Sequence, residues 1–433
     1  MTAHLFPFTD PVQLTQSPPM EIVSGDGARV TDRQGKTYLD AVAGLWCASL
    51  GFTPARLQQA AQEQIGRLGY YHSFMGRTSS PTLQLAERLV ARLPDGLEHV
   101  FFGTSGSEAV EAAVKFARYV QASRGKPGKV RIIAREGAYH GSGHISAALT
   151  GMAYCHDGFH LPQAEVLRTG RAHFYGDGLP GETETAFVAR RAAELEALIE
   201  REGAETICAF IGEPLMGSGG VFLPPEGYWP AIQAVLKRHD ILLIADEIIT
   251  GFGRTGRWFG CETYGITPDL MTMAKQLTGG IFPLSAIAMT PEIYDGIAAH
   301  AHSLGTFGHG VTYGGHPVGA AVALETLAIY EEMDLEAHIG ALGAHLSHRL
   351  ADLQGLPGIG DIRSIGLIAG IEFAPEDRPA AELTRAVGLA AQQRGVLFRV
   401  INTVLAISPP YICTTADIDQ MVDAMGESIQ ACV

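Results

Sequence analysis

The segment "ILLIADEIITGFGRTG", residues 241–256, decides the fold class. Five apolar residues, 241–245, run without a polar break, and Asp246 and Glu247 follow at once. Such a short apolar run is typical of a strand buried on both faces of a parallel sheet. Because strand side chains alternate between faces, only one of the two acids points to the same side as the inner residues. We assign that position to Asp246, and expect Glu247 to form a structural ion pair with Arg254.

The same pattern recurs along the chain. The strand-like runs "HVFFG", "KVRIIA" and "TICAFIG" alternate with the helical segments "EAVEAAVKFARYVQ" and "WPAIQAVLKRHD". This alternation predicts an α/β fold with a mainly parallel sheet. After about residue 320 a long helical segment and the short strands "LIAGIEF" and "VLFRV" predict a second, smaller subdomain. The early segment "GARVTDRQGKTYLDAVAG" is predicted to form a hairpin that packs with this C-terminal part.

Composition excludes several classes of function. The chain has 433 residues and a net charge of −15, which disfavours binding to nucleic acid. It contains no stretch of about 20 apolar residues, as a membrane span requires. The six cysteines form no CxxC pair and no zinc-like spacing, so we expect no metal site and a reducing, cytoplasmic location. Residues 1–20 lack the pattern of a secretion signal and are expected to form an arm.

Residues 100–120, "VFFGTSGSEAVEAAVKFARYV", predict a strand, a turn of small residues and a helix. A helix N-terminus presents free N–H groups and a partial positive charge. Ser105 and Ser107 add hydroxyl groups, and Gly106 lets the backbone approach a ligand closely. The segment therefore predicts a phosphate site, and an ordinary N-cap is an equally good interpretation of these residues alone.

Lysine is scarce, and one lysine stands apart. Lys275 lies in "PDLMTMAKQLTGGIFPLSA", and no other charged residue occurs between Leu270 and Thr290. Desolvation lowers the pKa of a lysine and turns it into an amine nucleophile, whereas a lysine that extends its amine to solvent is the alternative. Charged or polar neighbours predict that the other five are solvated at the surface: Lys36, Lys115, Lys126, Lys129 and Lys237.

A phosphate site, a buried carboxylate and a desolvated lysine are the groups that hold pyridoxal phosphate. They bind its phosphate, its ring nitrogen and its aldehyde, respectively. A GxGxxG match at Gly176, Gly178 and Gly181 has no apolar strand directly before it, so a nicotinamide dehydrogenase is a distant alternative.

With these residues, the chain resembles the class III aminotransferases of pyridoxal-phosphate fold type I, particularly the amine:pyruvate (omega) transaminases. The resemblance runs nearly end to end, through "GLWCASLG", "GTSGSEAVEAAVK", "AYHGSG", "GEPLMGSGGVFLPPEGYW", "LLIADEIITGFGRTG", "PDLMTMAKQLTGG", "GHGVTYGGHPVGAAVAL" and "ISPPYICT". It implies a large cofactor-binding domain with a seven-stranded, mainly parallel sheet (61–325), and a smaller α+β domain. The smaller domain would comprise residues 326–433 and part of 1–60, which also hold the arm. It further implies a homodimer with shared active sites, and leaves tetramer formation open.

The resemblance also implies roles for individual residues. Lys275 would bind the cofactor covalently and carry a proton during catalysis, and Asp246 would bind the pyridine nitrogen. Tyr139 would stack on one ring face with His140 beside it, and Ile248 would pack on the other. The remaining cofactor contacts would come from Ser105, Gly106 and Ser107 at the phosphate, Thr312 at the phosphate of the neighbouring subunit, and Glu213 beneath the cofactor.

For the substrate, the resemblance implies pocket aromatics at Trp46 and Phe74. Arg399 takes the place of a mobile arginine that binds an acceptor carboxylate and swings aside for an apolar amine. A structural ion pair is the other interpretation of Arg399. Ser142 stands where relatives that use 2-oxoglutarate often have arginine, which favours pyruvate as acceptor. The family pattern is altered in the expected donor pocket at Gln276, Ile281 and Phe282.

The predicted activity is therefore a ping-pong transamination between an amine or ω-amino acid and a keto acid. The same cofactor chemistry serves decarboxylases and aminomutases, which remain alternatives. A non-catalytic regulator that binds the cofactor is a third alternative, although it would not need Lys275, Asp246 and Arg399 together.

Overall fold

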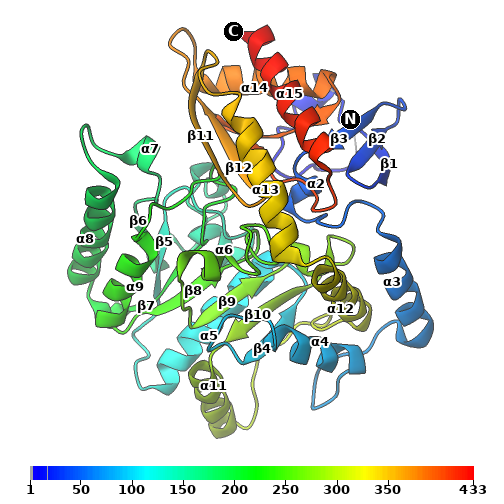
Figure 1. The fold of residues 1–433 in the computed structure, drawn as a ribbon. Helices are drawn as coiled ribbons and strands as arrows, with labels where there is room; N and C mark the ends of the chain where they lie inside the picture. The colour runs from blue at the N-terminus through cyan, green and yellow to red at the C-terminus, as the bar shows by residue number, and fades with distance from the viewer. Residues whose placement is uncertain (1–2, 17) are drawn as a thin grey trace.

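The computed structural model describes residues 3–16 and 18–433, and its centre is a seven-stranded sheet (Figure 1). The predicted arm, residues 1–20, thus includes three residues outside this description. The strand order is β4-β10-β9-β8-β7-β5-β6, and β10 alone runs antiparallel to its neighbours. The predicted, mainly parallel sheet is confirmed. Its strands are β4 (His99–Gly103), β5 (Arg131–Arg135), β6 (Val166–Thr169), β7 (Ile207–Gly212), β8 (Leu242–Asp246), β9 (Leu270–Met273) and β10 (Ser285–Met289).

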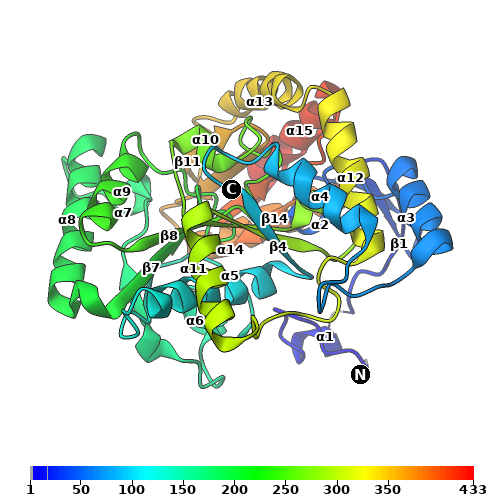
Figure 2. The same cartoon turned by 90° about the horizontal axis from the view of Figure 1, so that it is seen from below.

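Helices cover both faces of this sheet. Leu242 and Ile244 of β8 belong to one buried cluster, together with α5 (Gly106–Ser123), whereas Leu243 belongs to the cluster that contains α9 (Tyr228–Arg238). This alternation explains why every position of β8 is apolar up to its last residue. Figure 2 shows α5 and α11 on the near side of the sheet. The helices on the two faces include α6 (His144–Leu149), α8 (Glu184–Glu202) and α11 (Pro291–Leu304).

Two four-stranded sheets lie beside the large one. The predicted hairpin forms from β2 (Arg29–Asp32) and β3 (Thr37–Asp40), flanked by β1 (Ile22–Asp26), and β13 (Val396–Leu397) pairs in parallel with β3. The N-terminal hairpin thus packs with the C-terminal part, as expected, and Figure 1 shows it in blue near the red helix α15. The second sheet contains β11 (Ile359–Ile365), β12 (Ile368–Phe373), β15 (Val404–Ile407) and β14 (Arg399–Ile401). The domain boundaries at residues 60 and 325 stay a prediction.

The remaining helices surround these sheets. Among the described residues, every helix is too short or too polar to cross a membrane. The longer ones are α3 (Ala55–Leu68), α4 (Ser80–Val90), α12 (Pro317–Glu332), α13 (Leu335–Ala351), α14 (Ala380–Gln393) and α15 (Thr415–Cys432). The shorter ones are α1 (Gln13–Gln16), α2 (Ala43–Trp46), α7 (Phe174–Asp177), α10 (Gly260–Tyr264) and the 3-10 turns η1 (Ala153–Cys155), η2 (Gln163–Glu165), η3 (Ala204–Thr206) and η4 (Lys275–Thr278).

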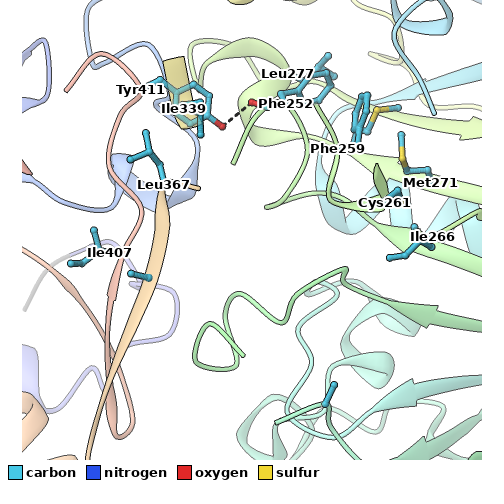
Figure 3. Packing of buried hydrophobic residues seen from close by; sticks show 14 of the residues in the cluster. Phe252, Phe259, Cys261, Ile266, Met271, Leu277, Ile339, Leu367, Ile407 and Tyr411 are labelled. Carbon is cyan, nitrogen blue, oxygen red and sulfur yellow. Dashed lines mark hydrogen bonds between the residues drawn. The ribbon is translucent and has the colours of Figure 1, made fainter. Parts of the chain in front are cut away.

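One buried cluster joins the large sheet to the C-terminal part (Figure 3). Tyr411 packs in this cluster, and its hydroxyl donates a hydrogen bond of 2.8 Å to the carbonyl of Phe252. Arg254, which is fully buried, lies with its guanidinium carbon 4.6 Å from the Tyr411 ring centroid. Its Nη1 donates to the carbonyls of Leu367 and Pro409. The turn after β8 is therefore held directly by the C-terminal segments.

The expected ion pair between Glu247 and Arg254 is wrong. Glu247 instead accepts hydrogen bonds from the Thr250 hydroxyl and from the backbone N–H groups of Gly260 and Cys261. These two N–H groups open α10, where the helix start favours a negative charge. Glu247 does point away from the Asp246 side, as alternation predicts, but its partners come from a helix start that the sequence pattern did not reveal.

The Tyr411 hydrogen bond gives a test of this junction. We expect Tyr411→Phe to lower the free energy of unfolding by about 1–2 kcal/mol, because the Phe252 carbonyl loses its donor in a buried place. Tyr294→Phe is the matched control, since Tyr294 is exposed and stacks on His99 through its ring alone. Denaturant unfolding of both variants measures the difference. Equal midpoints for the two variants would show that the junction does not depend on this bond.

Candidate functional site

Four loops meet at the carboxyl edge of the large sheet, where ligands of open parallel sheets bind. Asp246 ends β8, Glu213 directly follows β7, and Lys275 follows β9 by two residues. Tyr139 and His140 come from the loop after β5. The strand order places β5, β7, β8 and β9 side by side, so the sheet itself brings these residues together.

Three groups form hydrogen bonds with the carboxylate of Asp246. Its Oδ2 lies 2.7 Å from His140 Nδ1, and its Oδ1 accepts from Ile248 N and Thr272 Oγ1 at 3.2 and 3.3 Å. Both Asp246 and His140 are buried. The His140 Nε2 is also buried and has no hydrogen-bond partner among the described residues. His140 therefore orients the carboxylate, a role that sequence analysis missed because the pair is 106 residues apart.

Lys275 opens the turn η4 in a left-handed conformation, with φ of 47°. Such a conformation is uncommon outside glycine and is a form of strain often found at functional sites. Burial lowers the pKa of Lys275, and the negative charges of Asp246 and Glu213 oppose this shift. The direction agrees with the prediction made from its apolar surroundings, and the opposing charges place Lys275 near both carboxylates.

The prediction for Lys129 is wrong. This lysine is only 5% exposed, and its Nζ donates to the Asp240 carbonyl and lies 3.2 Å from the Asp240 carboxylate. The nearby carboxylate and carbonyl offset the desolvation of the ammonium group. Among the lysines, Lys275 is the one that lies at the carboxyl edge of the sheet.

Glu213 links two of the loops. Its Oε1 accepts from the backbone N–H of Tyr139 at 3.2 Å, and its Oε2 accepts from that of Gly217 at 2.8 Å. Burial raises the pKa of Glu213. Arg135, fully buried at the end of β5, donates to the Glu213 carbonyl. Sequence analysis missed Arg135. Its position at the end of an apolar strand, like that of Asp246, could have marked it as a buried residue near the site.

The start of α5 faces the same site. Ser105 is the N-cap, and its Oγ accepts from Glu108 N at 3.2 Å, so the ordinary capping interpretation holds for this residue. A Cβ at Gly106 would lie 2.9 Å from Ile248 Cδ1, so a larger residue there would displace the Ile248 side chain. The Ser107 hydroxyl accepts from Ser142 N at 3.0 Å, beside the Tyr139 turn. First-turn N–H groups have no partner within a helix, so those of Gly106 and Ser107 suit a phosphate.

Two of the predicted substrate residues lie near this edge. Trp46 is buried, has φ of 65°, and packs in a cluster with Leu215 and Ile249, which lie just beyond Glu213 and Asp246. Arg399 is exposed on β14, and its guanidinium forms no ion pair or hydrogen bond within the described residues. Burial raises the pKa of Tyr139, and the charge of Arg399 opposes this shift. Arg399 therefore acts on the Tyr139 side of the site, and the interpretation as a structural ion pair has no support in this structure.

Phe74 and Thr312 lie together on two other loops. The Thr312 carbonyl accepts from the Tyr70 hydroxyl at 3.0 Å, and the Phe74 ring packs on Gly310. Within residues 3–16 and 18–433, neither residue forms a hydrogen bond with Lys275, Asp246 or Tyr139. Both are exposed. A single chain thus leaves these two predicted residues outside the cluster.

Of the three positions that depart from the family pattern, Gln276 lies outside the pocket. Its side chain is buried and donates to the Ile249 carbonyl at 2.9 Å, while its own carbonyl accepts from Tyr330. Phe282 packs against His316 and Gly319, next to α12. Ile281 packs on the main core. Gln276 therefore stabilises the loop after β8 through its hydrogen bond to the Ile249 carbonyl.

These groups fit pyridoxal phosphate. A lysine with a lowered pKa, a buried carboxylate oriented by histidine, and a glycine-opened helix start lie at one edge of the sheet. Residues 12–429 match the family model of aminotransferase class III. The chain belongs to the class III aminotransferases. Members of this family use pyridoxal phosphate, and this aminotransferase is a pyridoxal-phosphate-dependent transaminase of fold type I.

Named relatives share most of the length of this aminotransferase. The chain is 44% identical to gamma-aminobutyrate transaminase 1, mitochondrial, of Oryza sativa subsp. indica, over 99% of this chain and 84% of that protein. It is also 44% identical to gamma aminobutyrate transaminase 3, chloroplastic, of Solanum lycopersicum, over 98% and 83%. The crystal structure of the omega transaminase from Pseudomonas jessenii in complex with PMP has a TM-score of 0.97 and 42% identity, over 99% of this chain and 96% of that chain.

The electrostatics of Lys275 predict a pH dependence. The cofactor-free protein should capture pyridoxal phosphate through the neutral amine, so the rate should rise with pH around a midpoint below that of an ordinary lysine. Since the charge of Asp246 raises the pKa of Lys275, Asp246→Asn should move this midpoint further down. Stopped-flow absorption of the bound cofactor at a series of pH values measures it.

Asp269→Asn is the matched control for this experiment. Asp269 precedes β9, but its carboxylate accepts from Leu243 N, away from Lys275. We expect its midpoint to equal that of the wild type. An unchanged or higher midpoint in Asp246→Asn would contradict the placement of Lys275 beside Asp246.

Proposed function

We propose that this aminotransferase moves an amino group from an amine or ω-amino acid to a small keto acid, with pyruvate as the favoured acceptor, by a ping-pong mechanism. The observation that carries the proposal is Arg399, a cation that has no ionic partner among residues 3–16 and 18–433 and whose charge acts on Tyr139. A guanidinium matches a planar carboxylate with two parallel hydrogen bonds. Ser142 supplies no second cation, which favours a monocarboxylate.

The residues at the sheet edge have distinct roles in this proposal. Bound pyridoxal phosphate supplies the electron sink that accepts the electron pair released at the substrate Cα. Lys275 Nζ would take the proton from the substrate Cα, since its lowered pKa keeps the amine neutral more readily. Asp246, oriented by His140, would keep the ring nitrogen of the cofactor protonated. Tyr139 and Ile248 would confine the ring, and Gly106 and Ser107 would bind the phosphate, while Ser105 caps the helix.

A homodimer would complete the site. Phe74 and Thr312 lie on exposed loops that do not reach the cluster of their own chain, and these loops also expose Tyr70, Met75 and Tyr313. Exposed apolar patches of this kind mark interaction surfaces. We propose that the two loops enter the active site of the partner chain, with Thr312 at its phosphate.

The donor and the location follow from separate observations. Relatives are named gamma-aminobutyrate transaminases, so this ω-amino acid is the first donor to test beside a simple amine. We propose a cytoplasmic location, which the six unpaired cysteines support. The alternatives of a decarboxylase, an aminomutase or a non-catalytic regulator predict that an amine and a keto acid are not consumed together.

Absorption spectroscopy tests this exchange. The cofactor band should bleach when 1-phenylethylamine or 4-aminobutyrate is added and return with pyruvate. Lys275→Ala should lower the rate of bleaching by at least about a thousandfold, because it removes the base and the covalent attachment. Lys237→Ala, at an exposed position on α9, is the control and should react as the wild type does. A band that no amine bleaches would contradict the proposed exchange.

Arg399 gives a test of the acceptor. We expect Arg399→Gln to raise KM for pyruvate about tenfold to a hundredfold, since a charge-assisted hydrogen bond to the carboxylate is lost. The amine half-reaction with 1-phenylethylamine should be retained. Steady-state and half-reaction kinetics measure both values. If pyruvate binding does not change, the acceptor carboxylate is bound by another group.

A further inference from the structure

A cavity of about 690 Å³ lies beside Arg399, outside the cluster around Lys275. Its walls come from the residues before β1, the N-terminal hairpin, α14 and the segment 397–399. Two carboxylates, Asp32 and Asp40, line it together with Arg399. Both aspartates are more than nine-tenths buried, which is a costly position for an acid without a partner.

The two aspartates differ in how their oxygens are used. Asp32 accepts from Gln34 N and Lys36 N through Oδ1, and from the Tyr38 hydroxyl through Oδ2. Asp40 accepts from Val42 N and Gly44 N, both through Oδ1. Within the described part of the chain, Asp40 Oδ2 has no hydrogen-bond partner. Asp40 thus has one oxygen available to the cavity.

The strand register brings Asp40 close to Arg399. In the parallel pairing of β3 with β13, Asp40 lies directly opposite Leu397, at a spacing of about 5 Å between neighbouring strands. Arg399 follows Leu397 by two residues, which span at most about 7 Å of chain. An extended arginine side chain is long enough to reach Asp40 from there, whereas in this structure the charge of Arg399 acts on Tyr139. Arg399 and Asp40 are therefore opposite charges in one cavity wall, and neither has an ionic partner within the described residues.

We propose that Asp40 receives the Arg399 guanidinium when an apolar amine occupies the active site. This rests on the proposed function, in which Arg399 binds a substrate carboxylate, and on the sequence-based expectation that this arginine swings aside for an apolar donor. Asp40 then determines the fraction of molecules in which Arg399 is away from the substrate, and so it determines the relative affinity for apolar and carboxylate substrates. In that state the free Oδ2 of Asp40 is paired with the guanidinium. Burial raises the pKa of Asp40, and the nearby cation would oppose this shift.

The test uses Asp40→Asn in the holoenzyme. Asparagine keeps Oδ1 as the acceptor for Val42 and Gly44 but removes the charge. The apparent Kd of a ligand rises as its competent state becomes rarer. We expect the apparent Kd for 1-phenylethylamine, measured by single-turnover bleaching of the cofactor band, to rise about threefold to tenfold. The apparent Kd for L-alanine, whose carboxylate keeps Arg399 in place, should change less than about twofold.

Two further variants separate the proposal from a general effect of structure. Asp32→Asn removes the other cavity carboxylate, whose oxygens are already used, and should leave the ratio of the two Kd values unchanged. In an Arg399→Gln background, Asp40→Asn should no longer affect 1-phenylethylamine, because the two residues act through each other. Circular dichroism and bound cofactor per chain check folding. If Asp40→Asn does not fold, Asp40→Ser replaces it, since a serine hydroxyl still accepts from Val42 N.

Three results would overturn the proposal: an equal change for both substrates, the same change in Asp32→Asn, or a change that persists without Arg399. Loss of bleaching by both substrates in the wild type would instead refute the proposed transamination itself. The two failures are thus distinguishable in one set of traces.

Discussion

The structure depends on how the strand β8 ends. The strand is buried between two helical layers, so its last side chain would be a buried, unpaired charge if nothing met it. His140, Thr272 and the backbone at Ile248 meet Asp246 there. A buried carboxylate at the end of β8 is stable only because three segments supply donors. The loops after β5 and β8 and the strand β9 must therefore keep their positions around Asp246.

Lys275 and Glu213 follow from the same constraint. Each stands just beyond a strand that neighbours β8, so the order of parallel strands determines their distance from Asp246 without any contact specific to catalysis. The strained backbone of Lys275 and Trp46 is then tolerated because the sheet and the core beneath it are rigid. The chemistry is thus concentrated in the few residues that leave the sheet.

The large sheet, the hairpin and the positions of Asp246 and Lys275 could be predicted, because apolar runs, turn residues and strand ends are local features of the sequence. The pairing of His140 with Asp246 could not, since no local pattern connects residues so far apart. The predictions of a solvated Lys129 and of an ion pair between Glu247 and Arg254 are wrong for the same reason: the actual partners are brought in by the fold. Thr312 illustrates a different limit, because its predicted role concerns a second chain.

The pairing of β3 with β13 has a consequence for biosynthesis. The hairpin is made before residues 396–397, which form the fourth strand of the same sheet. All strands of the large sheet lie between them and can associate earlier, since domains fold as their segments emerge. Closing so long a loop is slow compared with local pairing. The sheet edge that carries Lys275 can therefore form before β13 pairs with β3, and so before Arg399, two residues beyond β13, reaches the Tyr139 side of the site.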